Sequence, residues 1–230
     1  MHEFRFPTNT QRTAVVGRTG SGKTQFAAWL LSHADFLSQP YVIVDFKGDD
    51  LLNSIPYLQR ISLNDIPTEA GLYIVRPNPA TDSEAIETFL MNIWAQGNIG
   101  VYIDESYMIE KDSPALSACL TQGRSKHIPM ICLTQRPAWI SRFVFSESDY
   151  FAIFHLNDKR DQKTVEQFMP ESVEERLPEY NCRWFDVGHN KIFRLLPVPD
   201  RENIIQRFEE KLSLLHDEKR SALKAKTKFI

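Results

Sequence analysis

Eight consecutive residues near the start of the chain form a pattern that can hold a phosphate chain. The segment Gly17-Arg18-Thr19-Gly20-Ser21-Gly22-Lys23-Thr24 fits GxxxxGK[ST] and lies between an apolar run and a segment with helical spacing. The three glycines let successive backbone N–H groups turn inward around a phosphate, and the following helix adds its positive N-terminal end. Lys23 supplies a point charge to the β- and γ-phosphates, and the Thr24 hydroxyl can bind Mg²⁺. The loop therefore predicts ATP and Mg²⁺ as ligands.

A second candidate is the acidic end of the apolar run Val101-Tyr102-Ile103, which continues into Asp104 and Glu105. A carboxylate at the C-terminal tip of a buried parallel strand lies in the crevice where such sheets bind ligands. Asp104 suits a hold on Mg²⁺, whereas Glu105 points away from Asp104 and suits polarising the attacking water. Taken alone, the pair is explained equally well as solvated acids at a strand end. Together with the glycine loop it favours a catalytic site.

The polar pair Thr134-Gln135 follows another apolar run and precedes Pro137. A neutral amide at that point can hydrogen-bond both the γ-phosphate and the water without competing with Mg²⁺. The alternative is a polar strand end with no role in chemistry. We predict that Gln135 is a catalytic residue.

Two arginines are candidates for a cation that neutralises transition-state charge in the site of a neighbouring subunit. Arg124 follows a predicted helix and can reach outward, and Arg136 follows the strand that ends at Gln135. A surface ion pair explains Arg124 as an alternative, and an ordering of the loop before Pro137 explains Arg136. We favour Arg124 as the trans-acting residue.

The elements that must position these side chains alternate between short apolar runs and longer amphipathic segments, as in an α/β sheet with crossover helices. Continuous β-branched runs predict strands buried on both faces of a parallel sheet. Strands are expected over 13–16, 41–46, 72–75, 101–103, 130–133 and 150–155. Helices are expected over 26–34, 82–96 with Ser83 as N-cap, 114–124 and 158–169.

The pattern changes toward the end of the chain. Residues 181–187 and 191–196 flank Gly188-His189-Asn190, which predicts an antiparallel hairpin on the sheet edge. Residues 201–226 form an amphipathic helix that becomes basic. The predicted organisation is therefore one core over 1–200 that includes the edge hairpin, followed by a C-terminal helix and basic tail over 201–230.

Composition excludes several classes of protein. With 230 residues, 42% of them hydrophobic and 25% charged, the chain is neither disordered nor fibrous. A net charge of -3 argues against a globally basic coat on nucleic acid, so DNA would have to meet a local basic surface. The three cysteines form no CxxC pair, which fits a reducing compartment. No apolar run has the length of a membrane span and no signal peptide is visible, so we expect a cytoplasmic location.

These motifs also carry a family resemblance. The glycine loop, the strand ending in Asp104-Glu105, and Gln122-Gly123-Arg124-Ser125-Lys126-His127-Ile128-Pro129 followed by Leu133-Thr134-Gln135-Arg136-Pro137 together resemble the HerA/FtsK superfamily of P-loop DNA-pumping ATPases. The segment Val44-Asp45-Phe46-Lys47-Gly48-Asp49 resembles the family's stretch after its second strand. The similarity covers about residues 12–154. Because the chain is short, it is most similar within this superfamily to the genome-packaging ATPases of membrane-containing icosahedral double-stranded DNA viruses.

The resemblance implies several properties that the residues alone do not. It implies a RecA-like core in which the Gln135 strand lies between the loop strand and the Asp104 strand. It also implies a homo-hexameric ring that threads double-stranded DNA through its channel and docks on capsid or packaging-vertex proteins. The place of action would be the host cytoplasm or the packaging vertex of the virion.

Other functions and the DNA contacts stay open at this point. A conjugation or mobilisation pump of the same superfamily, or a nucleotide-gated phage assembly and export protein, would share the nucleotide motifs. The discriminator is whether double-stranded DNA stimulates ATP hydrolysis. Candidate DNA contacts are Lys126, Arg142, Lys159, Arg160 and Lys163, although ordinary solvated side chains explain each of them. A basic tail could dock on DNA or on an anionic membrane, or be a solvated helix end without a function; its residues are Lys219, Arg220, Lys224, Lys226 and Lys228.

Overall fold

A computed structural model describes the backbone of residues 4–227 and the side chains of residues 4–217. In this part of the chain nine strands form a single sheet: β1 (Arg12–Val16), β2 (Pro40–Asp45), β3 (Gln59–Arg60), β4 (Gly71–Val75), β5 (Gly100–Asp104), β6 (Met130–Thr134), β7 (Tyr150–Ile153), β8 (Cys182–Asp186) and β9 (Lys191–Leu195). The helices are α1 (Lys23–His33), α2 (Asp50–Asn53), α3 (Ser83–Gln96), α4 (Pro114–Gln122), α5 (Phe143–Ser146), α6 (Lys159–Glu166) and α7 (Arg201–Thr227). Two 3₁₀ turns, Ser106–Met108 and Pro137–Trp139, follow β5 and β6.

The sheet order is β3-β4-β2-β5-β6-β1-β7-β8-β9. The strands from β3 to β7 in this order run parallel, and β8 and β9 are antiparallel to their neighbours. The predicted α/β fold with a mainly parallel sheet and an antiparallel edge hairpin is therefore confirmed. The β6 strand lies between β1 and β5, which is the order that the family resemblance implied.

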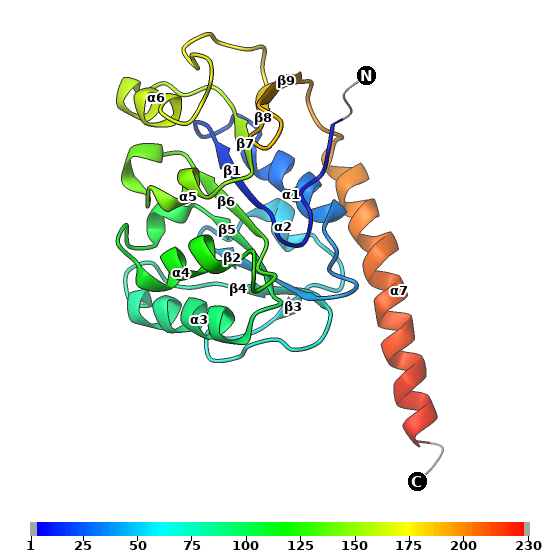
Figure 1. Ribbon diagram of the computed structural model, residues 1–230. Coiled ribbons are helices and arrows are strands. Elements are labelled where there is room, and N and C mark those ends of the chain that lie inside the picture. The colour runs from blue at the N-terminus through cyan, green and yellow to red at the C-terminus, as the bar shows by residue number, and fades with distance from the viewer. Residues whose placement is uncertain (1–3, 228–230) are drawn as a thin grey trace.

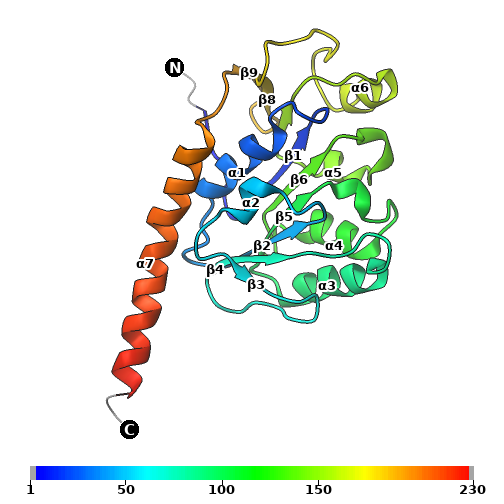
Figure 2. The ribbon, with the colours of Figure 1, turned by 180° about the vertical axis from the view of Figure 1, so that it is seen from behind.

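Helices cover both faces of the sheet (Figures 1 and 2). The helices α3 to α6 lie on one face, and α1, α2 and α7 lie on the other. Neighbouring strand residues point to opposite faces, so Val16 joins the cluster that contains Phe89 of α3, whereas Val15 joins the cluster that contains Phe26 of α1. Because both faces are covered, the strands are apolar throughout instead of alternating.

The shortest elements were not predicted. The β3 strand consists of two exposed residues, Gln59 and Arg60, which pair with β4. Because neither residue is apolar, no hydrophobic pattern marks this strand in the sequence. The α2 and α5 helices have four residues each, which is too short for helical periodicity to be visible. Several predicted ends also extend too far, since α4 ends at Gln122 and α6 at Glu166.

The prediction that Ser83 is the N-cap of the third long helix is wrong. Asp82 occupies that position and Ser83 is the first helical residue, with its hydroxyl donating to Glu110 at 2.8 Å. The Asp82 carboxylate makes no capping bond to the helix, because it accepts from the backbone N–H of Asn78 at 2.8 Å instead. The Asp82 carboxylate therefore takes part in a local turn and does not cap the helix.

The first half of α7 is part of the core. Ile204, Phe208 and Leu212 are buried in the same cluster as α1, and the ring of Phe208 stacks on Phe36 with centroids 6.0 Å apart. The basic residues Lys219, Arg220, Lys224 and Lys226 lie outside the described side chains, and Lys228 lies outside the described residues altogether. None of the helices that the structure describes has the length and apolar character needed to cross a bilayer.

We expect Phe208→Ala to destabilise the whole domain, because a fully buried aromatic ring is lost and a cavity remains. The expected loss of unfolding free energy is about 3 to 5 kcal/mol, measured by urea denaturation. The control is Leu214→Ala on the same helix, where the side chain is 60% exposed and the expected change is below about 0.5 kcal/mol. Equal small effects of the two variants would show that α7 does not belong to the folded core.

A candidate nucleotide-binding site

The glycine loop joins β1 to α1 and is attached to the ends of two neighbouring strands. The N–H of Gly17 donates to the carbonyl of Thr134 at the end of β6, at 3.2 Å, and the N–H of Arg18 donates to the carbonyl of His155 after β7, at 2.9 Å. A Cβ atom at position 17 would lie 2.5 Å from Cβ of Phe154, so only glycine fits there. The backbone of the sheet thus fixes where the loop begins.

Lys23 lies inside this loop. Its Nζ donates to the carbonyl of Arg18 at 3.1 Å, and the residue is only 6% exposed. Burial, together with the charge of Lys47, lowers the pKa of Lys23 from 10.5 to about 8, although Asp104 opposes the shift. The hydroxyl of Ser21 is buried without a partner in the same loop. A dehydrated ammonium group and an unpaired hydroxyl at a helix N-terminus fit a phosphate chain.

Asp104 ends β5 at the same edge of the sheet. It is 1% exposed, and its Oδ2 has no hydrogen-bond partner. Burial raises the pKa of Asp104 to about 6, with Lys47 and Lys23 opposing the shift. Thr24, the other predicted Mg²⁺ ligand, is half-buried in the first turn of α1.

An unpaired buried carboxylate oxygen and a half-buried hydroxyl are both oxygen ligands of the kind that Mg²⁺ prefers. Among the described residues, no three His, Cys, Asp or Glu side chains are gathered as a metal cage. Two such oxygen donors fit a Mg²⁺ ion that is held in part by phosphate oxygens.

Glu105 lies beside Asp104 but is held by a residue that the sequence did not single out. Its backbone adopts the left-handed conformation, with φ of 59°, and its side chain is 1% exposed. One carboxylate oxygen pairs with Nζ of Lys47, which follows β2, and the other has no partner. A lysine just past the end of a parallel strand was the signal that could have revealed this contact, since all parallel strands end at one edge.

Gln135 connects the end of β6 with two other parts of the site. Its Oε1 accepts from the hydroxyl of Thr19 in the glycine loop. Its Nε2 donates to the hydroxyl of Tyr107, at 3.1 Å, in the 3₁₀ turn after β5. Tyr107 was also missed from the sequence, because a tyrosine in a short turn carries no pattern of its own.

Asp45 at the end of β2 is a further buried acid of this edge. It lies beside Asp104 in the strand register. One of its oxygens accepts from the N–H of Gly48 at 2.9 Å, and the other lies 3.3 Å from Nε of Arg76. Asp45 therefore organises the loop that carries Lys47.

The two candidate arginines lie at opposite ends of the parallel strands, Arg136 at the carboxyl ends and Arg124 at the amino ends. Arg136 lines a cavity with Arg18, Thr19 and Gln135 at the edge of the glycine loop. Arg124 precedes β6 and pairs with Asp149, which itself precedes β7, so it lies at the other edge. The five residues of β6 separate the edges by about 16 Å. Arg124 is thus not part of the nucleotide site of its own chain.

The amino-acid sequence of the chain is similar to that of a phage protein. It is 44% identical over 216 residues to the DNA packaging ATPase P9 of Enterobacteria phage PRD1, which covers 90% of this chain and 95% of the phage protein. No protein-family model matches the chain.

Solved structures share the fold at lower identity. The genome packaging NTPase B204 of Sulfolobus turreted icosahedral virus 2, in complex with AMP, superposes with a TM-score of 0.64 and 21% identity over 84% of this chain and 100% of B204. ATPases 2 and 3 of EssC from Geobacillus thermodenitrificans give a TM-score of 0.64 and 14% identity over 90% of this chain and 45% of the solved chain that holds these two ATPases.

We expect Asp104→Asn to raise the melting temperature of the nucleotide-free protein at pH 8. Because burial raises the pKa of Asp104 from 3.8 to about 6, the folded protein binds a proton more tightly than the unfolded chain, and this stabilisation is lost as the pH rises through about 6. Asparagine is neutral at every pH, so the gain should be about 5 °C at pH 8 and small at pH 4. Thermal melts across this range, with exposed Asp112→Asn as control, provide the measurement. A gain of the same size at both pH values would contradict the assignment.

Proposed function

Because the chain belongs to the family of viral DNA-packaging ATPases, we propose that it hydrolyses ATP to move double-stranded DNA into a preformed capsid. The observation that carries this proposal is the meeting of three strand ends. The glycine loop after β1, Gln135 after β6 and the Asp104-Glu105 pair after β5 lie at one edge of the sheet, on adjacent strands. This order allows a single triphosphate to be contacted by all three.

The glycine loop and Lys23 would bind the phosphate chain. The loop N–H groups and the N-terminus of α1 would face the phosphates, and Lys23 would exchange the carbonyl of Arg18 for β- and γ-phosphate oxygens. Thr24 and Asp104 would hold Mg²⁺, which would supply positive charge to neutralise the phosphates when it is bound.

Glu105 and Gln135 would act on the attacking water. Glu105 would accept its proton, and Gln135 would orient it beside the γ-phosphate. Lys47 holds one carboxylate oxygen of Glu105 in an ion pair, so Lys47 would have to leave Glu105 before this oxygen accepts a proton. Its side chain is 40% exposed, which leaves it room to do so. Lys47 also lies close enough to Lys23 to lower the pKa of Lys23, which suits a second cation for the γ-phosphate.

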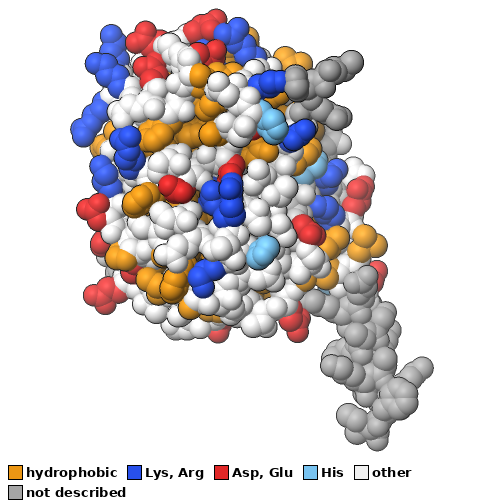
Figure 3. Space-filling view, in the orientation of Figure 1, with side chains coloured by type: hydrophobic (Ala, Val, Ile, Leu, Met, Phe, Trp, Pro, Cys, Tyr) orange, Lys and Arg blue, Asp and Glu red, His pale blue; other side chains and the backbone are white. Residues whose placement is uncertain are grey.

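The DNA would meet a local basic surface, since the chain carries a net charge of -3. Figure 3 shows blue side chains along the upper left, where α6 lies in Figure 1. Exposed basic residues on α6 are Lys159, Arg160 and Lys163, and the exposed Arg142 hydrogen-bonds to Gln167 just after that helix. Lys126 is separate from them, because it packs over the ring of Trp94 at 4.4 Å.

We propose a homo-hexameric ring around the DNA, docked on capsid or packaging-vertex proteins. In this proposal the protein works in the host cytoplasm and at the packaging vertex of the virion. A ring is supported by the position of Arg124, which lies at the far end of β6 from the glycine loop, about 16 Å away, and could therefore reach a nucleotide only in a neighbouring chain.

We expect double-stranded DNA to stimulate phosphate release by the wild-type protein, and Glu105→Gln to lose about 10²-fold or more in turnover because the base is removed while its shape is kept. ATP binding should be retained in Glu105→Gln, whereas Lys23→Ala should lose both binding and turnover. Steady-state phosphate release and equilibrium ATP binding are the measurements.

Two results would contradict this function. ATPase activity that is indifferent to DNA would favour a phage assembly or export protein. Normal hydrolysis by Glu105→Gln would assign the water-polarising role to another residue.

We expect Arg124→Ala to bind ATP normally but to lose most of its turnover, because an arginine supplied in trans is worth about 10³ to 10⁵ in rate. Mixing it with Lys23→Ala should restore part of the activity, since the second variant has a dead site but an intact Arg124. The measurement is phosphate release against mixing ratio with DNA present. Arg60→Ala, at an exposed arginine on β3, is the control that should change little.

Background activity at every mixing ratio would exclude a trans role for Arg124. Arg136, which lies at the nucleotide edge, would then be the arginine to test.

A further inference from the structure

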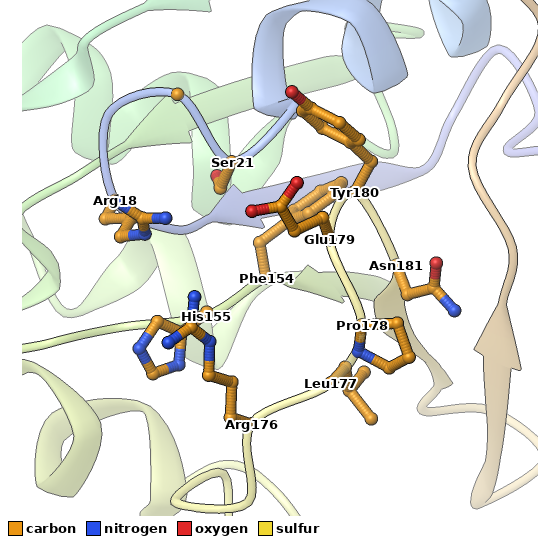
Figure 4. A pocket seen from close by; sticks show the side chains of 11 residues that line it. Arg18, Ser21, Phe154, His155, Arg176, Leu177, Pro178, Glu179, Tyr180 and Asn181 are labelled. Atoms are coloured by element: carbon orange, nitrogen blue, oxygen red, sulfur yellow. The ribbon is translucent and has the colours of Figure 1, made fainter.

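A second cavity lies beside the glycine loop, on the side away from Asp104 and Glu105. It is lined by Arg18 and Ser21 of the loop, by Phe154 and His155 after β7, and by residues 176–181, which precede β8 (Figure 4). The proposed roles of the phosphate-binding and catalytic residues make no use of this cavity.

The sheet order fixes the direction in which a bound nucleotide must extend, if the proposed ATPase function is right. Asp104 and Gln135 belong to β5 and β6, on one side of β1, whereas the cavity belongs to β7 and β8, on the other side. A nucleoside triphosphate is a chain with the γ-phosphate at one end and the nucleoside at the other. With its γ-phosphate toward Asp104 and Gln135, its nucleoside extends over the loop toward the cavity.

Tyr180 forms the wall of the cavity nearest to α1. A Cβ atom at Gly22 would lie 3.2 Å from Cδ1 of Tyr180, so the ring sits against the end of the glycine loop. The residue has a φ of 61°, and the N–H of Asn181 donates to the carbonyl of Pro178 at 3.2 Å across this turn. A bulky residue in the left-handed region is strained, which is typical of functional positions. The ring nevertheless remains 54% exposed and can receive a planar ligand.

The opposite wall is basic. Arg18, His155 and Arg176 lie next to one another in Figure 4. Burial, with Arg176 and Arg18 nearby, lowers the pKa of His155, so its ring is neutral at neutral pH. Its Nδ1 is buried and has no partner. The wall therefore offers two guanidinium groups for an anion and one imidazole nitrogen for a hydroxyl.

We propose that this cavity binds the nucleoside half of ATP, with the base stacked on Tyr180 and the α-phosphate and ribose facing Arg18, Arg176 and His155. Stacking uses the face that all bases share, so Tyr180 supplies affinity for the nucleoside without reading the edge of the base. The segment 176–181 would then be the nucleoside-binding wall of the site.

The test compares ATP with inorganic tripolyphosphate, which has the phosphate chain but no nucleoside. Dissociation constants of both, measured by calorimetry with Mg²⁺ present, are compared for wild type, Tyr180→Ala, Tyr180→Phe and Tyr57→Ala. Tyr57 is a matched control, because it is 46% exposed and has a φ of 57°.

We expect Tyr180→Ala to weaken ATP binding by about tenfold and to leave tripolyphosphate binding unchanged. Tyr180→Phe should bind both ligands like wild type, because a phenyl ring also stacks, and Tyr57→Ala should do the same. Unchanged tripolyphosphate binding also shows that the variant and its glycine loop are folded.

Two outcomes overturn the proposal. An equal loss for ATP and tripolyphosphate would mean that Tyr180 only supports the loop, and no loss for either would place the base elsewhere. A wild-type protein that binds neither ligand would instead count against the proposed ATPase function, so the two failures are distinguishable.

Discussion

The backbone of β6 hydrogen-bonds to β1 on one side and to β5 on the other, and the site depends on this arrangement. Val16 lies beside Thr134, and Ile103 lies beside Cys132, so the three strands end within a residue or two of one another. The bond from the N–H of Gly17 to the carbonyl of Thr134 extends the same ladder into the glycine loop. A shift in register would separate the loop from the acids and the amide, whatever those side chains were. The apolar clusters on both faces of the sheet hold that register.

The same arrangement concentrates charge at a buried edge, and this has an energetic cost. Asp104 and Glu105 each keep a carboxylate oxygen without a partner. Burial lowers the pKa of Lys23 and raises the pKa of Asp104, and both shifts favour the neutral form of the side chain. Unpaired buried polar atoms are destabilising, so the rest of the domain must offset them. A phosphate chain and a divalent cation would supply the missing charges and ligands. The edge is therefore preorganised for a ligand and is unfavourable without one, which couples ligand binding to stability.

What could be predicted from the sequence was local. The glycine loop, the Asp104-Glu105 pair and Gln135 each follow an apolar run, and parallel strands bring such ends together. The contacts between these motifs were not predictable, because the pairing of Lys47 with Glu105 depends on the reach of long side chains across two strand ends. The same holds for Gln135 between Thr19 and Tyr107. The two-residue strand β3 has no pattern, and the predicted cap at Ser83 was wrong because the helix begins one residue earlier, with Asp82 at the N-cap position.

The position of Arg124 constrains how subunits would pack in a ring. Arg124 lies in the segment before β6, and Gln135 lies directly after it, so the two residues are at opposite ends of this strand. If Arg124 serves the neighbouring site, the amino-terminal edge of one sheet must face the glycine loop of the next. Such an interface is heterologous, and it closes into a ring when its rotation divides the circle evenly. In that ring β6 is a short rigid connection between a chain's own γ-phosphate and that of its neighbour.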